Sequence, residues 1–118
     1  MATIRITNLK LRAVIGTNDW ERECKQDVII NIRIDFDASK ASLSDNIKDT
    51  IDYKAITKDI IQDVESSQYF LLEKLAKSIL KIVMKNPLAI ETTVRVDKPL
   101  ALRFTDSVSV EISEKRES

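Results

Sequence analysis

The sequence predicts an α+β domain in which a four-stranded, mainly antiparallel sheet carries two helices on one face. Near both ends of the chain, apolar and polar side chains alternate, which is typical of strands with one buried face. Between them lie two segments with apolar residues at helical spacing, and no linker or repeat interrupts the chain. Two hairpins separated by a helical pair bury their apolar faces as two layers, so residues 1–118 should form one domain of ββααββ order.

The first hairpin is expected at the N-terminus. Apolar residues alternate within residues 4–11 but change phase near Asn8, a shift that a β-bulge in one long strand explains. Residues 30–36 alternate without interruption and give the clearest strand of the sequence. The loop between the two strands covers residues 16–25 and begins at Gly16, the only glycine of the chain.

Two helices are expected in the middle of the chain. Residues 53–64 place apolar side chains at helical spacing, and Asp52 precedes them as a capping residue. Residues 70–85 repeat the pattern, and Pro87 stops the second helix because a proline disfavours helical conformation in the residue before it. The polar residues 44–46 connect the first hairpin to the helices.

A second hairpin is expected at the C-terminal end. Valine alternates with charged residues at 94–97, and valine and isoleucine alternate with polar residues at 107–112, which predicts two more strands. The two edges of a four-stranded sheet are usually covered, charged or paired with another copy of the chain. The pattern therefore allows a ring of subunits.

The composition argues against several classes of function. Nineteen basic and nineteen acidic residues cancel, which removes the overall positive charge that non-specific nucleic-acid binding depends on. Charges interrupt every apolar stretch, so no segment approaches the roughly 20 apolar residues needed to cross a membrane. The N-terminus lacks the features of a secretory signal, and Cys24 is the only cysteine, so we expect a cytoplasmic protein without an intrachain disulfide.

The absence of histidine limits the possible chemistry. With no imidazole and a single thiol, one chain cannot assemble the usual Cys and His ligand sets for zinc. It also cannot form a Ser-His or Cys-His nucleophile pair. We therefore expect any catalysis to use Lys, Tyr, Asp, Glu, backbone groups or water, with no metal and no cofactor.

Two charged residues lie where a binding cleft could use them. Lys98 continues the inward phase of its strand just before Pro99, where desolvation would favour a neutral amine that acts as a base. Glu73 flanks the apolar stripe of the second helix, where its oxygens could accept paired N–H groups from a planar heterocycle. The residues alone favour plainer explanations: a lysine whose amine reaches solvent, and a glutamate that is solvated or paired with Lys77.

Two aromatic residues are further candidates. Tyr53 opens the first helix, where a phenol could donate or accept a proton on a neighbouring surface. Trp20, next to Glu21, is the only tryptophan and lies in the loop after the glycine, where it could pack on a ligand or partner. Alternatively, Tyr53 is an ordinary amphipathic residue at the boundary of the core, and Trp20 is an aromatic side chain that anchors the loop.

Four short motifs follow one another along the chain. They are Ile15-Gly16-Thr17-Asn18-Asp19-Trp20-Glu21, Ile51-Asp52-Tyr53, Leu71-Leu72-Glu73-Lys74-Leu75 and Lys98-Pro99. Together they resemble the dihydroneopterin aldolase family, and their order and spacing match that family from Ile4 to Ile112. The resemblance implies the tunnelling fold (T-fold), in which ring tetramers stack as octamers and active sites lie between neighbouring chains.

The resemblance also implies how a reduced pterin would bind. Glu73 would hold the N3–H and the 2-amino group of the ring. Backbone groups near Leu72 and Asp52 would assist it. Gly16 would also belong to the substrate-binding residues.

The reaction implied by the resemblance is a retro-aldol cleavage. The N5=C6 imine of 7,8-dihydroneopterin accepts the electrons of the C1'–C2' bond, so neither zinc nor a Schiff base is needed. Lys98, and Tyr53 from the adjacent subunit, would carry the protons, while Glu21 would help to shape the site. Cleavage gives glycolaldehyde and 6-hydroxymethyl-7,8-dihydropterin, whereas re-addition of the aldehyde gives the 2'-epimer.

Two branches of the family fit the motifs. Residues 71–75 and segments within 96–109 resemble dihydroneopterin triphosphate 2'-epimerases, whereas residues 19–21 and 98–99 resemble aldolases. We therefore expect a dihydroneopterin aldolase with epimerase activity in folate or related pterin synthesis, with the triphosphate epimerase as a close alternative. A noncatalytic pterin-binding assembly protein is a remote alternative, because all four candidate side chains are present. Arg103 could meet a phosphate, although an ordinary surface arginine also explains it.

Overall fold

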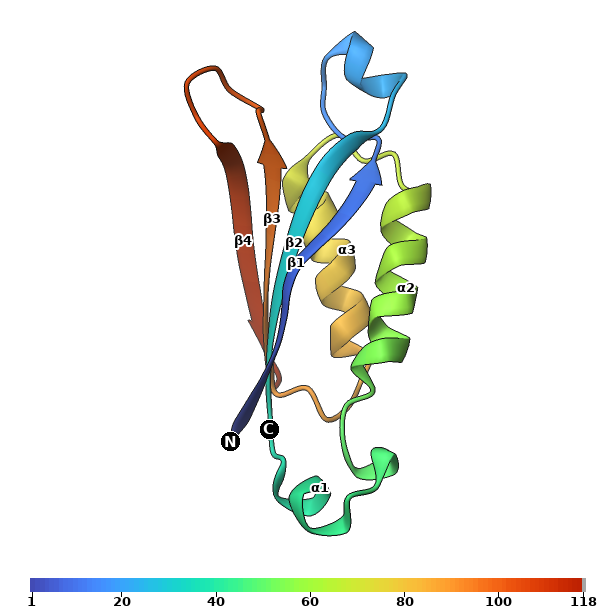
Figure 1. Cartoon of the computed structure of the whole chain (residues 1–118), viewed down its shortest axis with the longest axis vertical. Coiled ribbons are helices and arrows are strands. Elements are labelled where there is room, and N and C mark those ends of the chain that lie inside the picture. The colour runs from blue at the N-terminus through green and yellow to red at the C-terminus, as the bar shows by residue number, and fades with distance from the viewer. Residues whose placement is uncertain (118) are drawn as a thin grey trace.

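Four strands form one antiparallel sheet in the order β1-β2-β3-β4 (Figure 1). The structure is a computed structural model and describes residues 1–117. β1 (Ala2–Ala13) and β2 (Gln26–Phe36) form the N-terminal hairpin, and β3 (Glu91–Pro99) and β4 (Ser107–Lys115) form the C-terminal hairpin. Because β2 pairs with β3, the free edges are β1 and β4. The predicted four-stranded sheet is confirmed.

Two long helices cover one face of this sheet (Figure 1). α2 (Tyr53–Ser66) lies against β1, and α3 (Leu72–Met84) lies against β3 and β4. Asp52 caps α2, since its side chain accepts hydrogen bonds from the backbone N–H groups of Lys54 and Ala55, both at 3.1 Å. Both helices and the cap agree with the sequence prediction. Within residues 1–117, no helix has the length and apolar character needed to span a bilayer.

The start of α3 differs from the prediction. The sequence pattern placed Phe70 in the helix, but α3 begins at Leu72 because Leu71 has the extended dihedral angles of an N-cap, φ −116° and ψ 143°. Phe70 and Leu71 therefore belong to the connection between the helices, where 59% and 52% of their surfaces are exposed. This two-residue difference places both apolar side chains beside the candidate site described below.

Three short helical segments were not predicted. They are η1 (Asp19–Arg22), α1 (Ser39–Ser44) and η2 (Ile47–Asp49). Neither α1 nor η2 buries a side chain, so both lack the apolar periodicity from which a helix is recognised in a sequence. Only η1 carries a buried residue, Glu21.

The predicted bulge in β1 is present. The register between β1 and β2 shifts between Ile6 and Leu9, and Asn8 adopts a positive φ of 53°. The backbone N–H of Asn8 donates to Asn31 on β2 at 2.9 Å, and the Asn31 amide donates back to the Asn8 side chain at 3.2 Å. Asparagine tolerates this left-handed conformation better than most residues, which explains why the bulge occurs here.

The core lies between the sheet and the helices, and β2 runs through its centre. Every second residue of β2 from Val28 to Phe36 is buried. Opposite them pack Ile60 and Val64 of α2 and the apolar stripe of α3, including Ile79, which is fully buried. This packing fixes the ends of the strands and helices, and one end of the molecule carries the candidate site.

Candidate functional site

A cleft opens at the end of the molecule where the β1–β2 loop, the end of β3 and the start of α3 meet. Its volume is about 360 Å³, within the range of small-molecule sites. Three charged side chains line it, Glu21, Glu73 and Lys98, together with Gly16 and Leu72. Five of the predicted site residues therefore share one cleft. Within residues 1–117, no group of three or more His, Cys, Asp or Glu side chains could hold a metal ion.

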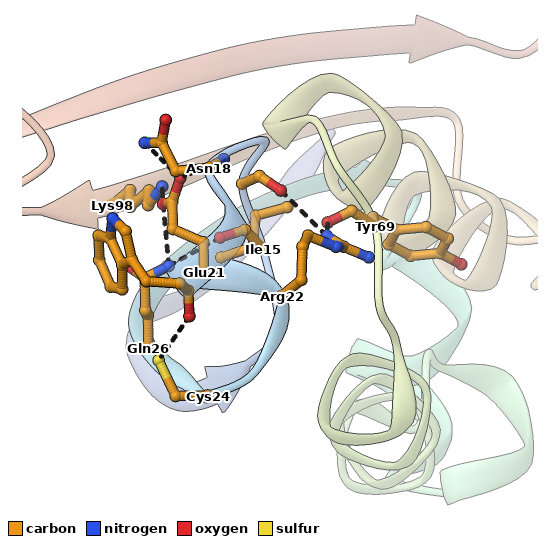
Figure 2. A network of polar contacts seen from close by, with 10 residues as sticks. Ile15, Asn18, Glu21, Arg22, Cys24, Gln26, Tyr69 and Lys98 are labelled. Carbon is orange, nitrogen blue, oxygen red and sulfur yellow. Dashed lines mark hydrogen bonds and ion pairs between the residues drawn. The ribbon is translucent and has the colours of Figure 1, made fainter.

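Glu21 is enclosed at the base of the cleft, with only 4% of its surface exposed. The helical turn η1 carries it inward, and its carboxylate accepts hydrogen bonds from the Asn18 backbone N–H at 3.1 Å and the Asn18 side-chain amide at 2.9 Å. The Gln26 amide donates to its other oxygen at 3.0 Å, and the ammonium of Lys98 forms an ion pair with that same oxygen (Figure 2). All these donors satisfy a buried charge that would otherwise be unfavourable.

Lys98 reaches this carboxylate from the end of β3. Its side chain is 13% exposed, which agrees with the inward phase expected from the sequence. The expectation of a neutral amine did not include a counter-ion, whereas the structure supplies Glu21. The ion pair places the amino group of Lys98, a possible proton donor, at the wall of the cleft.

Hydrogen bonds determine the protonation of Glu21. Burial by itself raises the pKa of this carboxyl, but hydrogen bonds from Lys98, Gln26 and Asn18 and the positive charge of Lys98 outweigh burial. The pKa falls to about 2. A carboxylate with so low a pKa is a poor proton acceptor near neutral pH, so Glu21 is better suited to hold Lys98 than to act as a base.

The low pKa of Glu21 predicts a loss of stability in acid. Because the folded-state pKa lies below the ordinary value of 4.5, the stabilisation is fully present above pH 4.5 and is lost as the pH falls towards about 2. Its size is on the order of 3 kcal/mol. Urea unfolding of the protein and of Glu21→Gln should give a stability difference that is constant above pH 4.5 and shrinks below it. A difference unchanged at about pH 3 would contradict this prediction.

Gly16 leaves the space that the Glu21 carboxylate occupies. Its φ is 125°, a conformation that side-chain-bearing residues rarely adopt. A Cβ atom built on Gly16 would overlap the Cδ and both carboxylate oxygens of Glu21. The only glycine of the chain is therefore required both for its backbone conformation and for the close approach of a charged side chain.

Arg22 links the two walls of the cleft. Its guanidinium donates to the carbonyl oxygen of Tyr69 at 3.0 Å (Figure 2), and also to the carbonyl oxygens of Gly16, at 3.0 Å, and Gln68. The same group lies over the Phe70 ring, 3.9 Å from its centroid. Because Gly16 belongs to the β1–β2 loop and the other three to the α2–α3 connection, Arg22 fixes the distance between Glu21 and the start of α3.

A second network holds the α2–α3 connection from the helix side. The Tyr69 hydroxyl donates to Ser78 Oγ at 3.2 Å, and the Ser78 hydroxyl donates to Asp63 at 2.7 Å. Asp63 lies on α2 and Ser78 on α3. Tyr69 is thus held through its hydroxyl and through its carbonyl, which gives the start of α3 a defined position.

Glu73 lies in the first turn of α3 and faces the cleft. No hydrogen bond or ion pair engages its carboxylate within the described part of the chain. Lys77, the intrahelical partner considered from the sequence, instead pairs with Glu114 of β4 at 3.2 Å. At the N-terminus of a helix, the first backbone N–H groups, including that of Leu72, also have no partner within the helix. The Glu73 oxygens and these N–H groups can therefore receive a ligand with donors and acceptors on one edge.

Tyr53 and Asp52 lie outside this cleft. Tyr53 begins α2, and the chain runs along the whole helix, about 21 Å, before it enters the connection to α3. Tyr53 is 52% exposed and lines a separate hollow on α2. One chain therefore does not bring Tyr53 to Lys98, and its predicted role requires a neighbouring copy.

Sequence reasoning missed three residues of this site, Asn18, Gln26 and Arg22. For Asn18 a signal existed, because Asn followed three residues later by Glu is a capping-box spacing. Gln26 and Arg22 have no comparable local signal, since their roles depend on contacts made after folding. Trp20, a candidate from the sequence, is 59% exposed and does not line the cleft.

Comparison with known proteins gives consistent results. The family model described as FolB, dihydroneopterin aldolase, matches residues 4–113. The dihydroneopterin triphosphate 2'-epimerase of Escherichia coli (strain K12) is 43% identical over 115 residues, which cover 98% of this chain and 96% of that protein. The dihydroneopterin aldolase of the same strain is 26% identical, covering 93% and 90%. The crystal structure of E. coli dihydroneopterin aldolase in complex with neopterin superposes with a TM-score of 0.91 at 25% identity, covering 97% and 99%.

Proposed function

This chain belongs to the dihydroneopterin aldolase family and has its tunnelling fold, and we propose that it inverts the 2' carbon of dihydroneopterin triphosphate. The observation that carries the proposal is the buried Glu21–Lys98 pair in the same cleft as Glu73, whose carboxylate has no partner within residues 1–117. The sequence alone favoured aldolase cleavage as the main activity. The 43% identity to an epimerase over almost the whole chain supports epimerisation as the main activity and aldolase cleavage as the second.

The proposed mechanism uses the side chains of the cleft and the substrate's own imine. Glu73 accepts hydrogen bonds from N3–H and the 2-amino group, which orients the pterin edge-on to the start of α3. A base removes the 2'-hydroxyl proton, the C1'–C2' bond breaks, and its electrons move into the N5=C6 imine. The cleaved aldehyde then turns and adds back through its other face, which re-forms C1'–C2' with the opposite configuration.

Proton transfer is assigned to Lys98 and Tyr53. As an ammonium, Lys98 can protonate N5 as the electrons of the C1'–C2' bond move into the imine, and the amine that this leaves can accept the proton of the 2'-hydroxyl. When the C1'–C2' bond re-forms, the ammonium returns a proton to the aldehyde oxygen and the amine takes back the proton of N5. The phenol of Tyr53 is the second carrier, and Glu21 keeps Lys98 in place. This chemistry needs no metal and no cofactor.

The proposed site is completed by a second copy of the chain. Tyr53 lies at the far end of α2 and cannot reach the cleft of its own chain, so we place it in the cleft of an adjacent subunit. Apolar side chains at the rim of the cleft, Phe70, Leu71 and Leu102, are more than half exposed in the single chain and could be covered there. Ring tetramers stacked as octamers follow from the family resemblance. We further propose that the protein is cytoplasmic and has no nucleic-acid or membrane partner.

Aldolase cleavage is the second candidate function. It is supported by the 0.91 TM-score with an aldolase that was crystallised with neopterin. The two activities share the cleavage step and differ in whether the aldehyde leaves or adds back. A noncatalytic pterin-binding protein remains the third and most distant candidate.

Parallel assays with two substrates test this order. Purified protein is incubated with dihydroneopterin and with its triphosphate, and both the 2'-epimer and the released aldehyde are measured. The proposal expects efficient inversion of the triphosphate with little release of aldehyde. Rapid release of glycolaldehyde from dihydroneopterin without inversion of the triphosphate would contradict this proposal and support aldolase cleavage as the function. No reaction with either substrate, together with tight pterin binding, would support the noncatalytic candidate.

The role of Glu73 predicts a loss of binding. Glu73→Ala should weaken the binding of neopterin by about 2 kcal/mol or more, roughly 30-fold, because charge-assisted hydrogen bonds to the ring are lost. Lys77→Ala is a suitable control, since Lys77 lies on the same helix but outside the cleft. Fluorescence or calorimetric titration measures both. Equal affinities of the Glu73 variant and the unmodified protein would remove Glu73 from the binding site.

A further inference from the structure

A second hollow lies on α2, away from the cleft. It is lined by Tyr53, Lys54, Thr57, Lys58 and Ile61, positions that recur along one face of the helix. Tyr53 is therefore not isolated at its end of the helix. Two lysines, four residues apart, share its surface.

The two lysines carry charge that the chain itself does not neutralise. Lys54 and Lys58 are both exposed, and neither forms an ion pair within residues 1–117. Asp59, next to Lys58 in sequence, does not line this hollow, and the carboxylate of Asp52 at the N-cap accepts hydrogen bonds from the backbone N–H groups of Lys54 and Ala55. This face of α2 is thus positively charged and available to an anion.

The cleft differs from this surface of α2, because its unpaired charge is negative. Of its three charged side chains, Lys98 is already paired with Glu21, and Glu73 has no partner in the described chain. The residues that line the cleft therefore offer the pterin a carboxylate but offer a triphosphate no unpaired cation. Arg103 lies in the nearby β3–β4 loop, but it does not line the cleft, and its guanidinium lies over the Phe104 ring at 5.2 Å.

We propose that Lys54 and Lys58 of one subunit bind the triphosphate of a substrate whose pterin is held in the cleft of the adjacent subunit. The inference rests on the proposed function, in which Tyr53 enters that cleft. Because the three side chains line one hollow on α2, an arrangement that brings the Tyr53 hydroxyl to the substrate's side arm also brings both lysines close to it. Side chains at this spacing have Cβ atoms about 5–6 Å apart, close enough to contact successive phosphates of one chain.

This arrangement separates the recognition of the two ends of the substrate. Glu73 selects the flat ring, whereas Lys54 and Lys58 select the charged tail. Each charge-assisted contact should contribute about 10-fold to the binding of the triphosphate, and both together about 100-fold. Dihydroneopterin, which has no phosphate, should be unaffected. The preference of the protein between the two substrates is therefore set on α2 and not in the cleft.

The test uses the double variant Lys54→Gln/Lys58→Gln of the full chain. We expect kcat/KM for dihydroneopterin triphosphate to fall about 100-fold and kcat/KM for dihydroneopterin to stay within about two-fold. The matched control is Lys81→Gln/Lys85→Gln, which removes two exposed lysines at the same spacing from the C-terminal turn of α3 and its cap, and neither of them lines the cleft or the Tyr53 hollow. The control should change neither value.

Binding of neopterin and of neopterin triphosphate gives a second readout that does not depend on turnover. In the unmodified protein, the triphosphate should bind more tightly and its affinity should fall as salt is added. In the Lys54→Gln/Lys58→Gln variant, the tighter binding of the triphosphate and its dependence on salt should both largely disappear. If the variant kept the full preference for the triphosphate, or lost affinity for both ligands equally, the inference would be wrong while the proposed function stands. If the unmodified protein bound neither ligand, the proposed function itself would fail.

Discussion

Replacing Lys98 by methionine is expected to lower kcat by about 10³-fold while pterin binding changes little. Proton transfer by a positioned side chain contributes about 10²–10⁴-fold to enzymatic rates, and methionine keeps most of the apolar stem but donates no proton. Single-turnover assays and neopterin titration measure the two effects separately. An unchanged rate would exclude Lys98 from proton transfer.

The same change should also destabilise the fold, so a second variant is needed. Removing Lys98 leaves Glu21 as an unpaired buried carboxylate, which costs about 3–5 kcal/mol in comparable pairs. Lys98→Met/Glu21→Gln replaces the ion pair by neutral groups of similar size, so its stability should return towards that of the unmodified protein. Its kcat should remain low. Recovery of turnover together with stability would mean that Lys98 acts only by supporting the fold.

Gly16→Ala is the second change with a large expected effect. The added methyl group overlaps the Glu21 carboxylate, and alanine is strained at a φ of 125°, so the buried ion pair must separate or the loop must move. We expect a loss of about 3 kcal/mol or more in the free energy of unfolding. Turnover should fall with it, because Lys98 loses its partner. Urea unfolding at constant protein concentration measures the stability.

A double-mutant cycle with Glu21→Ala separates the two causes. In that background the carboxylate is absent, so Gly16→Ala should cost only the backbone strain, about 1–3 kcal/mol. The difference between the two costs measures the steric conflict between the methyl group and the carboxylate. Equal costs in both backgrounds would show that the close approach of Gly16 and Glu21 does not matter.

Most of the fold could be predicted from the sequence because alternation and helical periodicity are local properties. The uninterrupted pattern of β2 reflects its central position, and the phase change at Asn8 corresponds to the observed register shift. The prediction of secondary structure failed where the local sequence pattern does not match the folded structure. α1 (Ser39–Ser44) buries no side chain, and the extended Leu71 makes α3 begin two residues later than the apolar pattern suggests.

The candidate site could be predicted only in part. Lys98 was recognised because it continues the inward phase of its strand, and Glu73 because it flanks the apolar stripe of its helix. The family resemblance then related the two residues to each other. The partner of Lys98 could not be derived, since Glu21 lies 77 residues away in the chain and meets it only in the folded sheet. The position of Tyr53 in a neighbouring cleft stays a prediction, because it depends on contacts between copies.

The bulge at Asn8 has a consequence for solubility. β1 is a free edge of 12 residues, and a long free edge exposes backbone groups on which foreign strands can add and aggregate. At Asn8 the alternation of outward N–H and C=O groups changes phase, so a regular incoming strand can match the residues on one side of the bulge but not on both. Amyloid-like growth on this edge is thereby discouraged, while a partner shaped to both halves can still add to it.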